Sequence, residues 1–147
     1  MRRRALKVKG LSALHRAIYA ATGGRIGKRI AGMPVLLLTT SGRKTGKRRT
    51  SPLTYFEEDG AIVLVASYGG RPHNPDWFEN LVAAGEGEVT IGRERRRMQA
   101  REATAEERAR LWPRIVETYD GYATYQSKTD REIPLAVLSP LARTVSE

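Results

Sequence analysis

The sequence predicts an α+β fold in which an antiparallel sheet closes into a small barrel, with helices at its periphery. Its strand-like segments follow one another through hairpin signals, without the strand–helix–strand alternation that a parallel sheet needs. Two apolar runs, residues 35–38 and 61–66, are uninterrupted, which indicates strands covered on both faces. Such strands favour a closed barrel over an open sheet, because closure leaves few exposed edges.

The chain is expected to be a single domain, residues 1–147, that begins with an amphipathic helix and a basic link. Apolar side chains recur at helical spacing over residues 5–22, and two glycines end this segment. Residues 23–33 then form a flexible link, so that residues 1–33 precede the sheet. The helix packs either on its own domain or, through its cations, on an anionic membrane surface.

The first half of the sheet is expected to begin at Pro34. This proline opens a strand over residues 35–40, and a second strand covers residues 52–57. Residues 58–60 (Glu-Asp-Gly) are a tight hairpin signal, which returns the chain along a third strand over residues 61–66.

A helix and a second hairpin follow. Asn74 is the expected N-cap of this helix, with Pro75 at its first position, and Gly85 ends it. Apolar and polar residues then alternate on both sides of residues 92–95, which predicts a hairpin across that segment.

The last predicted elements are a helix and a strand. Thr104 and Glu107 form a capping box that opens the helix. Pro113 must kink or restart this helix, because proline lacks a backbone N–H donor, and the helix then reaches Tyr119. The final strand is expected over residues 133–138.

Charge is distributed unevenly along the chain. The first 56 residues hold 14 Lys and Arg and no Asp or Glu, whereas the remaining 91 hold 12 against 16. The formal net charge of +10 is therefore +14 on the first part and −4 on the rest. This asymmetry indicates an anionic partner for the N-terminal third: nucleic acid, an acidic membrane surface or a phosphorylated small molecule.

Residues 41–50 (SGRKTGKRRT) concentrate five of these cations directly after the first apolar run. Glycines let backbone N–H groups approach a ligand, and Lys and Arg supply charge-assisted hydrogen bonds to an anion. It is not a Walker A loop: one residue too few separates Gly42 from Gly46, and Arg48 stands where Mg²⁺ coordination needs Ser or Thr. The segment is either an anion-binding loop or a solvated basic turn. The five cations are Arg43, Lys44, Lys47, Arg48 and Arg49.

Composition excludes several kinds of chemistry. The chain has no cysteine, which excludes disulfides, zinc–thiolate sites, iron–sulfur clusters and thiol nucleophiles. It offers no carboxylate pair, metal-ligand cluster or activated nucleophile, so an enzyme built on it would have to hold a reactive cofactor. No apolar run approaches the roughly 18 residues of a membrane span. We therefore expect a cytoplasmic protein, peripheral at the inner face of the plasma membrane if its N-terminal helix binds lipid.

Residues 66–75 (ASYGGRPHNP) join the third strand to the next helix and are a candidate ligand loop. Adjacent glycines allow a flat ligand to lie against bare backbone, with N–H groups free to bond its carbonyl edge. The helix N-terminus that follows favours electron-rich atoms. An ordinary connecting loop is the alternative. His73 has no triad partner beside it and is expected to be structural or at the surface.

Tyr119, Tyr122 and Tyr125 recur at three-residue spacing. On a helix such residues share a face, so they would form an aromatic wall tipped with hydroxyl groups. Core packing is the usual role of such a stripe. Gly121 and the polar residues that follow instead indicate a partly exposed segment, on which a planar substrate could stack.

Several motifs occur in the order known from one protein family. They are residues 36–46 (LLLTTSGRKTG), 49–53 (RTSPL), 65–70 (VASYGG), 74–77 (NPDW) with Asn80 and Leu81, and 119–127 (YDGYATYQS). Over residues 11–140 the chain resembles the deazaflavin-dependent nitroreductase and quinone reductase family of actinobacteria, which uses coenzyme F-420.

The resemblance implies a split β-barrel and a set of site residues. Those that would hold the phosphate and polyglutamate tail of the coenzyme are Arg43, Lys44, Thr45, Gly46 and Arg49. Those that would line the deazaflavin ring are Pro52, Thr54, Ala66, Ser67, Tyr68 and Gly69. Those that would border the substrate are Ser67, Tyr119, Tyr122 and Tyr125. Tyr68 and Thr54 depart from the family, in which Lys and an aromatic residue are common there. Backbone contacts to the coenzyme would survive both changes, so coenzyme binding should be little affected. The two departures are therefore expected to alter the range of substrates.

The expected function is hydride transfer from reduced coenzyme F-420 to a planar acceptor, a quinone first and nitroaromatics as adventitious substrates. Tyr122, with Tyr125 and Ser67, is the expected donor to the acceptor oxygen. FMN is the less favoured cofactor, since it has one phosphate and no glutamate tail, and no metal is expected.

The alternatives are a membrane-surface protein and a nucleic-acid-binding module, both without catalysis. Residues 23–50 contain no aromatic side chain among their cations, which argues against nucleic acid. A membrane-surface role leaves the glycines and the tyrosine series unexplained.

Overall fold

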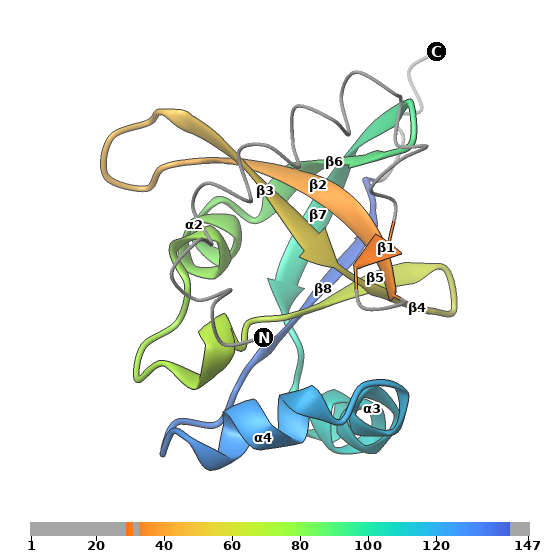
Figure 1. Cartoon of the computed structure of the whole chain (residues 1–147). Helices are drawn as coiled ribbons and strands as arrows, with labels where there is room; N and C mark the ends of the chain where they lie inside the picture. The colour runs from red at the N-terminus through yellow and green to blue at the C-terminus, as the bar shows by residue number, and fades with distance from the viewer. Residues whose placement is uncertain (1–28, 31–32, 142–147) are drawn as a thin grey trace.

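The computed structural model describes residues 29–30 and 33–141 and consists of one curled antiparallel sheet with helices packed against it (Figure 1). The predicted helix over residues 5–22 lies outside the described residues, as does most of the predicted basic link. The strands are β1 (Arg29–Ile30), β2 (Met33–Ser41), β3 (Arg48–Thr54), β4 (Phe56–Glu58), β5 (Ala61–Val65), β6 (Glu86–Ile91), β7 (Glu94–Glu102) and β8 (Leu135–Pro140). The helices are the short 3-10 helix η1 (Tyr68–Gly70), α2 (Asp76–Ala84), α3 (Ala105–Thr118) and α4 (Gly121–Ser127).

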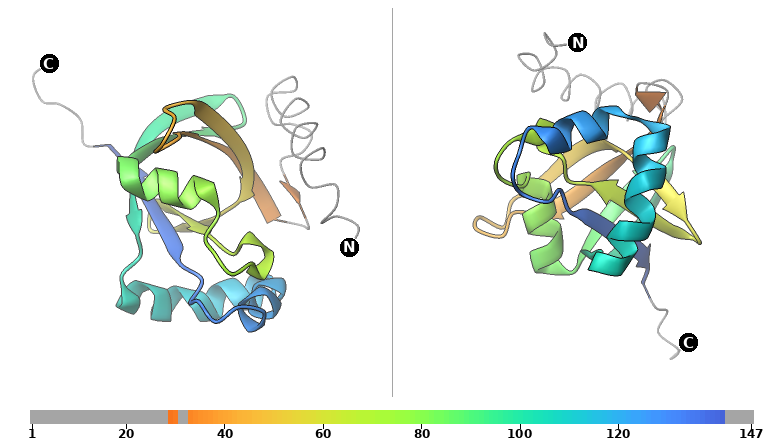
Figure 2. Two further views of the ribbon diagram at one scale, coloured as in Figure 1. Left: turned by 90° about the vertical axis from the view of Figure 1, so that its left-hand side faces the viewer. Right: turned by 90° about the horizontal axis from the view of Figure 1, so that it is seen from below.

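The order of the strands forces the sheet to curl. Along the sheet the order is β1-β2-β6-β7-β8-β5-β4, and β3 pairs with β2. β3 and β4 therefore lie at different edges of the sheet, yet the single residue Tyr55 joins them in the chain. One residue spans only about 3.5 Å, so the two edges must approach each other. The sheet closes into the predicted barrel, which Figure 2 shows from two further sides.

Two apolar clusters hold the fold together. β2 and β5 contribute to both, because alternate side chains of a strand point to opposite faces of the sheet. This burial on both faces confirms the prediction made from their uninterrupted apolar runs. The first cluster lies between the inner face of the barrel and α2, and its members include Leu36, Leu38, Leu64, Leu81, Met98 and Leu138. The second lies beneath α3 and α4, and its members include Met33, Val63, Leu111, Ile115, Ile133 and Leu135.

Local signals end or begin several elements as predicted. Asp59 and Gly60 take φ values of 50° and 83° in the turn between β4 and β5. Gly85 ends α2 with a φ of 76°. Thr104 and Glu107 form the predicted capping box at the start of α3.

The strands β1 to β3 and the helix α2 begin at other residues than predicted. The predicted link contains β1, and Met33 already belongs to β2. β3 begins at Arg48 rather than at residue 52, because its pairing with β2 continues along the basic residues. The N-cap of α2 is Pro75 rather than Asn74, whose side-chain amide instead donates to Glu79 at 2.8 Å.

The C-terminal elements differ as well. α3 runs through Pro113 to Thr118 as one element, so the proline removes one hydrogen bond without dividing the helix. Tyr119 lies between α3 and α4 rather than on a helix, and the last strand begins at Leu135.

Candidate functional site

Three segments that carry most of the predicted site residues follow one another along one side of the molecule. The turn between β2 and β3, together with the first two residues of β3 (residues 42–49, the basic turn), stands above α2, and the loop after β5 (residues 66–71, the glycine loop) follows below it. α4 lies next to that loop. Figure 1 shows this succession down its left-hand side, and the left view of Figure 2 shows it face-on.

The basic turn is closed by its own backbone and attached to α2. The Gly42 N–H donates to the Lys47 carbonyl and the Gly46 N–H donates to the Gly42 carbonyl, both at 2.8 Å. Arg43 attaches the turn to α2. Its backbone N–H and its guanidinium donate to Oδ1 of the buried Asn80, at 3.0 Å and 2.7 Å.

The remaining cations of this region fall into two groups. Arg48 is paired with Glu88 on β6 at 2.7 Å. Lys44, Lys47 and Arg49 are exposed, and within the described part of the chain no ion pair joins them to a carboxylate. Three cations are therefore available to an external anion.

The glycine loop contains three consecutive residues in the left-handed region: Tyr68, Gly69 and Gly70, with φ values of 51°, 64° and 84°. A non-glycine residue seldom adopts such a φ, so the conformation of Tyr68 has to be held by its surroundings. Its exposed ring lies against Arg71, whose guanidinium is 4.4 Å from the ring centre. The ring of His73 is 5.4 Å away and exposed, in agreement with its predicted surface position.

Ser67 is a buried polar residue in the glycine loop, with 8% of its surface exposed. Its carbonyl accepts the Gly70 N–H at 2.8 Å. Its hydroxyl group has no hydrogen-bond partner among residues 33–141, although burying an unpaired hydroxyl costs about 1–3 kcal/mol. A bound ligand would supply the missing partner.

The tyrosines form a packed cluster. The rings of Tyr119 and Tyr122 meet edge to face with centroids 5.2 Å apart, and those of Tyr122 and Tyr125 do so at 5.9 Å. Tyr122 is only 6% exposed and is more buried than predicted, because Phe56 also packs against its ring. Tyr119 and Tyr125 are half-buried, at the edge of the same cluster.

The hydroxyl groups of Tyr122 and Thr54 are hydrogen-bonded to each other at 2.8 Å. Burial raises the pKa of the Tyr122 phenol above its ordinary value, so this group stays protonated as a neutral donor at physiological pH. The bond joins α4 to the end of β3, and thereby brings a predicted substrate residue together with a predicted coenzyme residue.

Gly70 brings the glycine loop into direct contact with α4. A Cβ atom at this position would lie 2.6 Å from the Tyr125 carbonyl oxygen, which is closer than such atoms can approach. The backbone of the loop therefore rests on the backbone of the tyrosine helix. Any side chain at Gly70 would separate the two.

Sequence reasoning missed Arg131, which donates from its guanidinium to the carbonyls of Ala66 and Ser67. This arginine stands more than 60 positions from its acceptors, in a polar segment without periodicity. No local pattern distinguishes it from a solvated cation, so only the three-dimensional structure could reveal it.

These groups fit a ligand that has an anionic tail and a flat ring with carbonyl groups. The unpaired cations of the basic turn suit the tail. The backbone of the glycine loop and the Ser67 hydroxyl, which lacks a partner among residues 33–141, suit the ring and its oxygen atoms. Both segments are attached to one frame, since Arg43 holds the turn to α2 and the loop leads directly into that helix.

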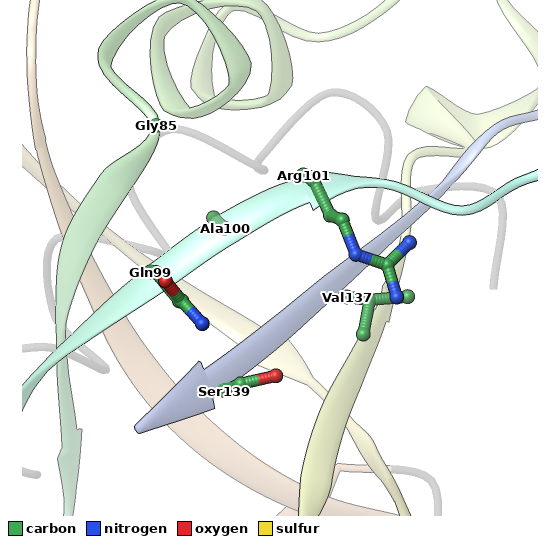
Figure 3. A pocket seen from close by; sticks show the side chains of 6 residues that line it. All are labelled: Gly85, Gln99, Ala100, Arg101, Val137 and Ser139. Atoms are coloured by element: carbon green, nitrogen blue, oxygen red, sulfur yellow. The ribbon is translucent and has the colours of Figure 1, made fainter. Parts of the chain in front are cut away.

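A surface pocket away from these segments offers no unpaired cation for an anionic tail. It has a volume of about 210 Å³ and lies over β7 and β8, as Figure 3 shows. Its one cation, Arg101, is already bonded to both carboxylate oxygens of Glu107, at 2.7 Å and 2.8 Å. Its lining residues are Gly85, Gln99, Ala100, Arg101, Val137 and Ser139.

A family model described as F420H2-dependent quinone reductase matches residues 11–140 of the chain. The chain belongs to this family. It is therefore a reductase, and coenzyme F-420 is its cofactor. Among the described residues, no helix is long and apolar enough to cross a membrane.

Individual relatives are similar over most of the chain. One from Mycobacterium tuberculosis is 44% identical over 130 residues, which are 86% of this chain and 87% of that protein. The solved F420-H2 dependent reductase FDR-A is 43% identical with a TM-score of 0.65, covering 72% of this chain and 94% of its own. A solved chain described as a domain-swapped dimer is 37% identical with a TM-score of 0.67, covering 86% and 96%. The predicted split β-barrel is confirmed by these likenesses.

Proposed function

We propose that the chain transfers a hydride from reduced coenzyme F-420 to a quinone, and that it reduces nitroaromatics as adventitious substrates. The observation that carries the proposal is the attachment of two complementary segments to α2. The basic turn, in which Lys44, Lys47 and Arg49 pair with no described carboxylate, lies on one side of this helix, and the glycine loop lies on the other (Figure 1). This spacing suits a coenzyme whose charge is at one end and whose reactive ring is at the other.

In this proposal the basic turn binds the phosphate and polyglutamate tail. Lys44, Lys47 and Arg49 supply the charges, and Thr45 and Gly46 shape the turn around them. Arg43 anchors the turn through Asn80, and its charge is partly balanced by the carboxylate of Asp76 at 3.6 Å.

The deazaflavin ring then lies along the end of β3 and the glycine loop. The lining residues are Pro52, Thr54, Ala66, Ser67, Tyr68 and Gly69. Contacts from the backbone of these residues would not depend on the side chains at Thr54 and Tyr68, which depart from the family.

When bound in its reduced form, the coenzyme supplies the hydride. The chain has to orient the quinone, exclude water and donate a hydrogen bond to the quinone oxygen as negative charge develops there. In the hydroxyl pair of Thr54 and Tyr122 one O–H donates within the pair, so one O–H remains for an acceptor. The half-buried Tyr125 lies beside this pair, and the Ser67 hydroxyl, which has no partner among residues 33–141, is a further donor.

The proposal also assigns a location. The protein works in the cytoplasm, and the helix predicted over residues 5–22 meets an anionic membrane surface from which a lipid-soluble quinone is supplied. The charge of +14 on the first 56 residues supports this assignment. The residues of that helix lie outside the described part of the chain.

The proposed reaction is tested by mixing the protein anaerobically with reduced coenzyme F-420 and either menadione or a nitroaromatic acceptor. We expect kcat/KM for the quinone to exceed that for the nitroaromatic by about tenfold or more, since the donors are arranged for a developing oxyanion. The return of the oxidised coenzyme's absorbance measures both rates. Equal rates for the two acceptors would contradict the assignment of a quinone.

Tyr122→Phe tests, in the same assay, whether the Tyr122 hydroxyl donates a hydrogen bond to the quinone oxygen. The variant keeps the ring, so it should lose only about 1 kcal/mol of unfolding free energy, from the bond to Thr54. Coenzyme affinity should be unchanged, whereas quinone turnover should fall several-fold. Thr54→Val removes the other half of the pair and should have a similar effect on turnover. Full activity of Tyr122→Phe would leave the donor role to Ser67.

A further inference from the structure

We propose that Arg131 is a positioning residue that aims two backbone N–H groups of the glycine loop, those of Ser67 and Tyr68, at the deazaflavin ring. The proposal rests on the proposed binding of that ring at this loop. Arg131 lies in the segment between α4 and β8 and has no assigned role in the reaction described above.

The guanidinium of Arg131 is bonded along the whole of the loop. It donates to the carbonyl of Ala66 at 3.2 Å, of Ser67 at 2.8 Å and of Arg71 at 2.9 Å. It also donates to Oδ1 of Asn74 at 2.7 Å, just before α2 begins. One side chain thus fixes the end of β5, both ends of η1 and the approach to α2.

These bonds determine the direction of the neighbouring N–H groups. A peptide unit is planar and trans, so its C=O and the N–H of the next residue point in opposite directions. The carbonyls of Ala66 and Ser67 point at Arg131, and the N–H groups of Ser67 and Tyr68 therefore point away from it. Neither N–H has an acceptor within the described ranges, so both are available to a ligand carbonyl.

The loop needs such support because its backbone is unfavourable on its own. Tyr68 is a non-glycine residue at a φ of 51°, and two further left-handed residues follow it. Besides Arg131, the hydrogen bonds that hold this stretch include those from the Gly70 N–H to Ser67 and from the Arg71 N–H to Tyr68. The positive charge of Arg131 also polarises the peptide units it bonds, which strengthens their N–H groups as donors. Arg131 forms no ion pair with a described carboxylate that would offset this charge.

Arg108 provides a matched control. It is a second partly buried arginine, and it donates to the Ile133 carbonyl, to Glu132 and to Gln126. It therefore braces the segment in which Arg131 lies, but it has no hydrogen bond to the glycine loop. Loss of Arg108 should cost stability without changing the direction of the loop's N–H groups.

The experiment compares Arg131→Met, Arg131→Lys and Arg108→Met with the natural protein. In Arg131→Met we expect the dissociation constant and the KM of coenzyme F-420 to rise about tenfold or more, with the KM of the quinone unchanged. Arg131→Lys keeps a cation that reaches fewer acceptors, so its dissociation constant for coenzyme F-420 should lie between those of the natural protein and Arg131→Met. Arg108→Met should lower the Tm and leave coenzyme affinity within about twofold of the natural value. A purely structural role would lower the active fraction, and hence apparent kcat, at constant KM.

Amide exchange without coenzyme separates this proposal from the proposed function. The Gly70 and Arg71 amides, which are bonded within the loop, should exchange about tenfold faster or more in Arg131→Met, and not in Arg108→Met. If the natural protein fails to bind coenzyme F-420, the proposed function is wrong, and this comparison still tests the positioning of the loop. If Arg131→Met does not fold, Arg131→Lys takes its place. Natural coenzyme affinity in a folded Arg131 variant, or unchanged amide exchange, would overturn the proposal.

Discussion

Gly70→Ala should destabilise the protein by about 3 kcal/mol and lower its reductase activity about a hundredfold. Two costs add at this position. The φ of 84° places an alanine in the left-handed region, which costs about 1–2 kcal/mol. In addition, the new Cβ would lie 2.6 Å from the Tyr125 carbonyl oxygen, a backbone atom that cannot turn aside. Relief of this overlap requires the loop and α4 to separate by about 1 Å, a displacement that can cost two orders of magnitude in rate.

Gly60→Ala is the matched control for this variant. Gly60 has nearly the same φ, 83°, and a Cβ there would meet nothing within 4 Å. Gly60→Ala should lose only about 1–2 kcal/mol of unfolding free energy, from its backbone conformation, and should retain natural activity. Denaturant unfolding and quinone turnover, measured on both variants, separate the two costs. Equal losses in the two variants would mean that contact between the loop and α4 contributes nothing.

Removal of the unpaired charges from the basic turn should have the second large effect. In the triple variant Lys44→Ala/Lys47→Ala/Arg49→Ala, the dissociation constant for coenzyme F-420 should rise about a hundredfold or more. Charge-assisted hydrogen bonds contribute about 1.5–3 kcal/mol each to the free energy of binding, and a solvent-exposed bond contributes less. The variant should bind coenzyme F-420 about as weakly as the natural protein binds a deazaflavin without phosphate or tail. Its affinity should also depend less on salt.

A control variant removes the same number of charges elsewhere. Arg93, Arg95 and Arg96 are exposed at the hairpin between β6 and β7. Their triple alanine variant changes the net charge equally and should alter coenzyme affinity by no more than about threefold. A similar loss of affinity in both triple variants would assign the effect to net charge, and would remove the tail site from the basic turn.

Much of the fold follows from rules that act over a few residues. The buried runs in β2 and β5, the turn at Asp59 and Gly60, and the capping box of Thr104 and Glu107 are each set by neighbouring side chains. The start of β3 is not set in this way. Residues 48–51 are too polar to suggest a strand, but β2 offers them an unbroken ladder of backbone partners, and this pairing prevails.

The candidate site could be predicted only in part for the same reason. Sequence order and charge single out the basic turn and the glycine loop as candidate ligand segments. The bonds that join them to the rest of the molecule connect residues far apart in the chain: Arg43 with Asn80, Thr54 with Tyr122, and Arg131 with Ser67. Such pairs have no periodic pattern, so these contacts could be seen only in the folded structure.

The most direct test of the account is a fluorescence titration of the purified protein with coenzyme F-420 and, separately, with FMN. Both ligands present a flat tricyclic ring to the glycine loop, but FMN has a single phosphate for the three unpaired cations of the basic turn. We predict that the protein prefers coenzyme F-420 by about tenfold or more, because FMN leaves at least one charge-assisted contact unmade. Equal affinities for the two ligands would contradict the account, since the basic turn would then have no part in choosing the cofactor.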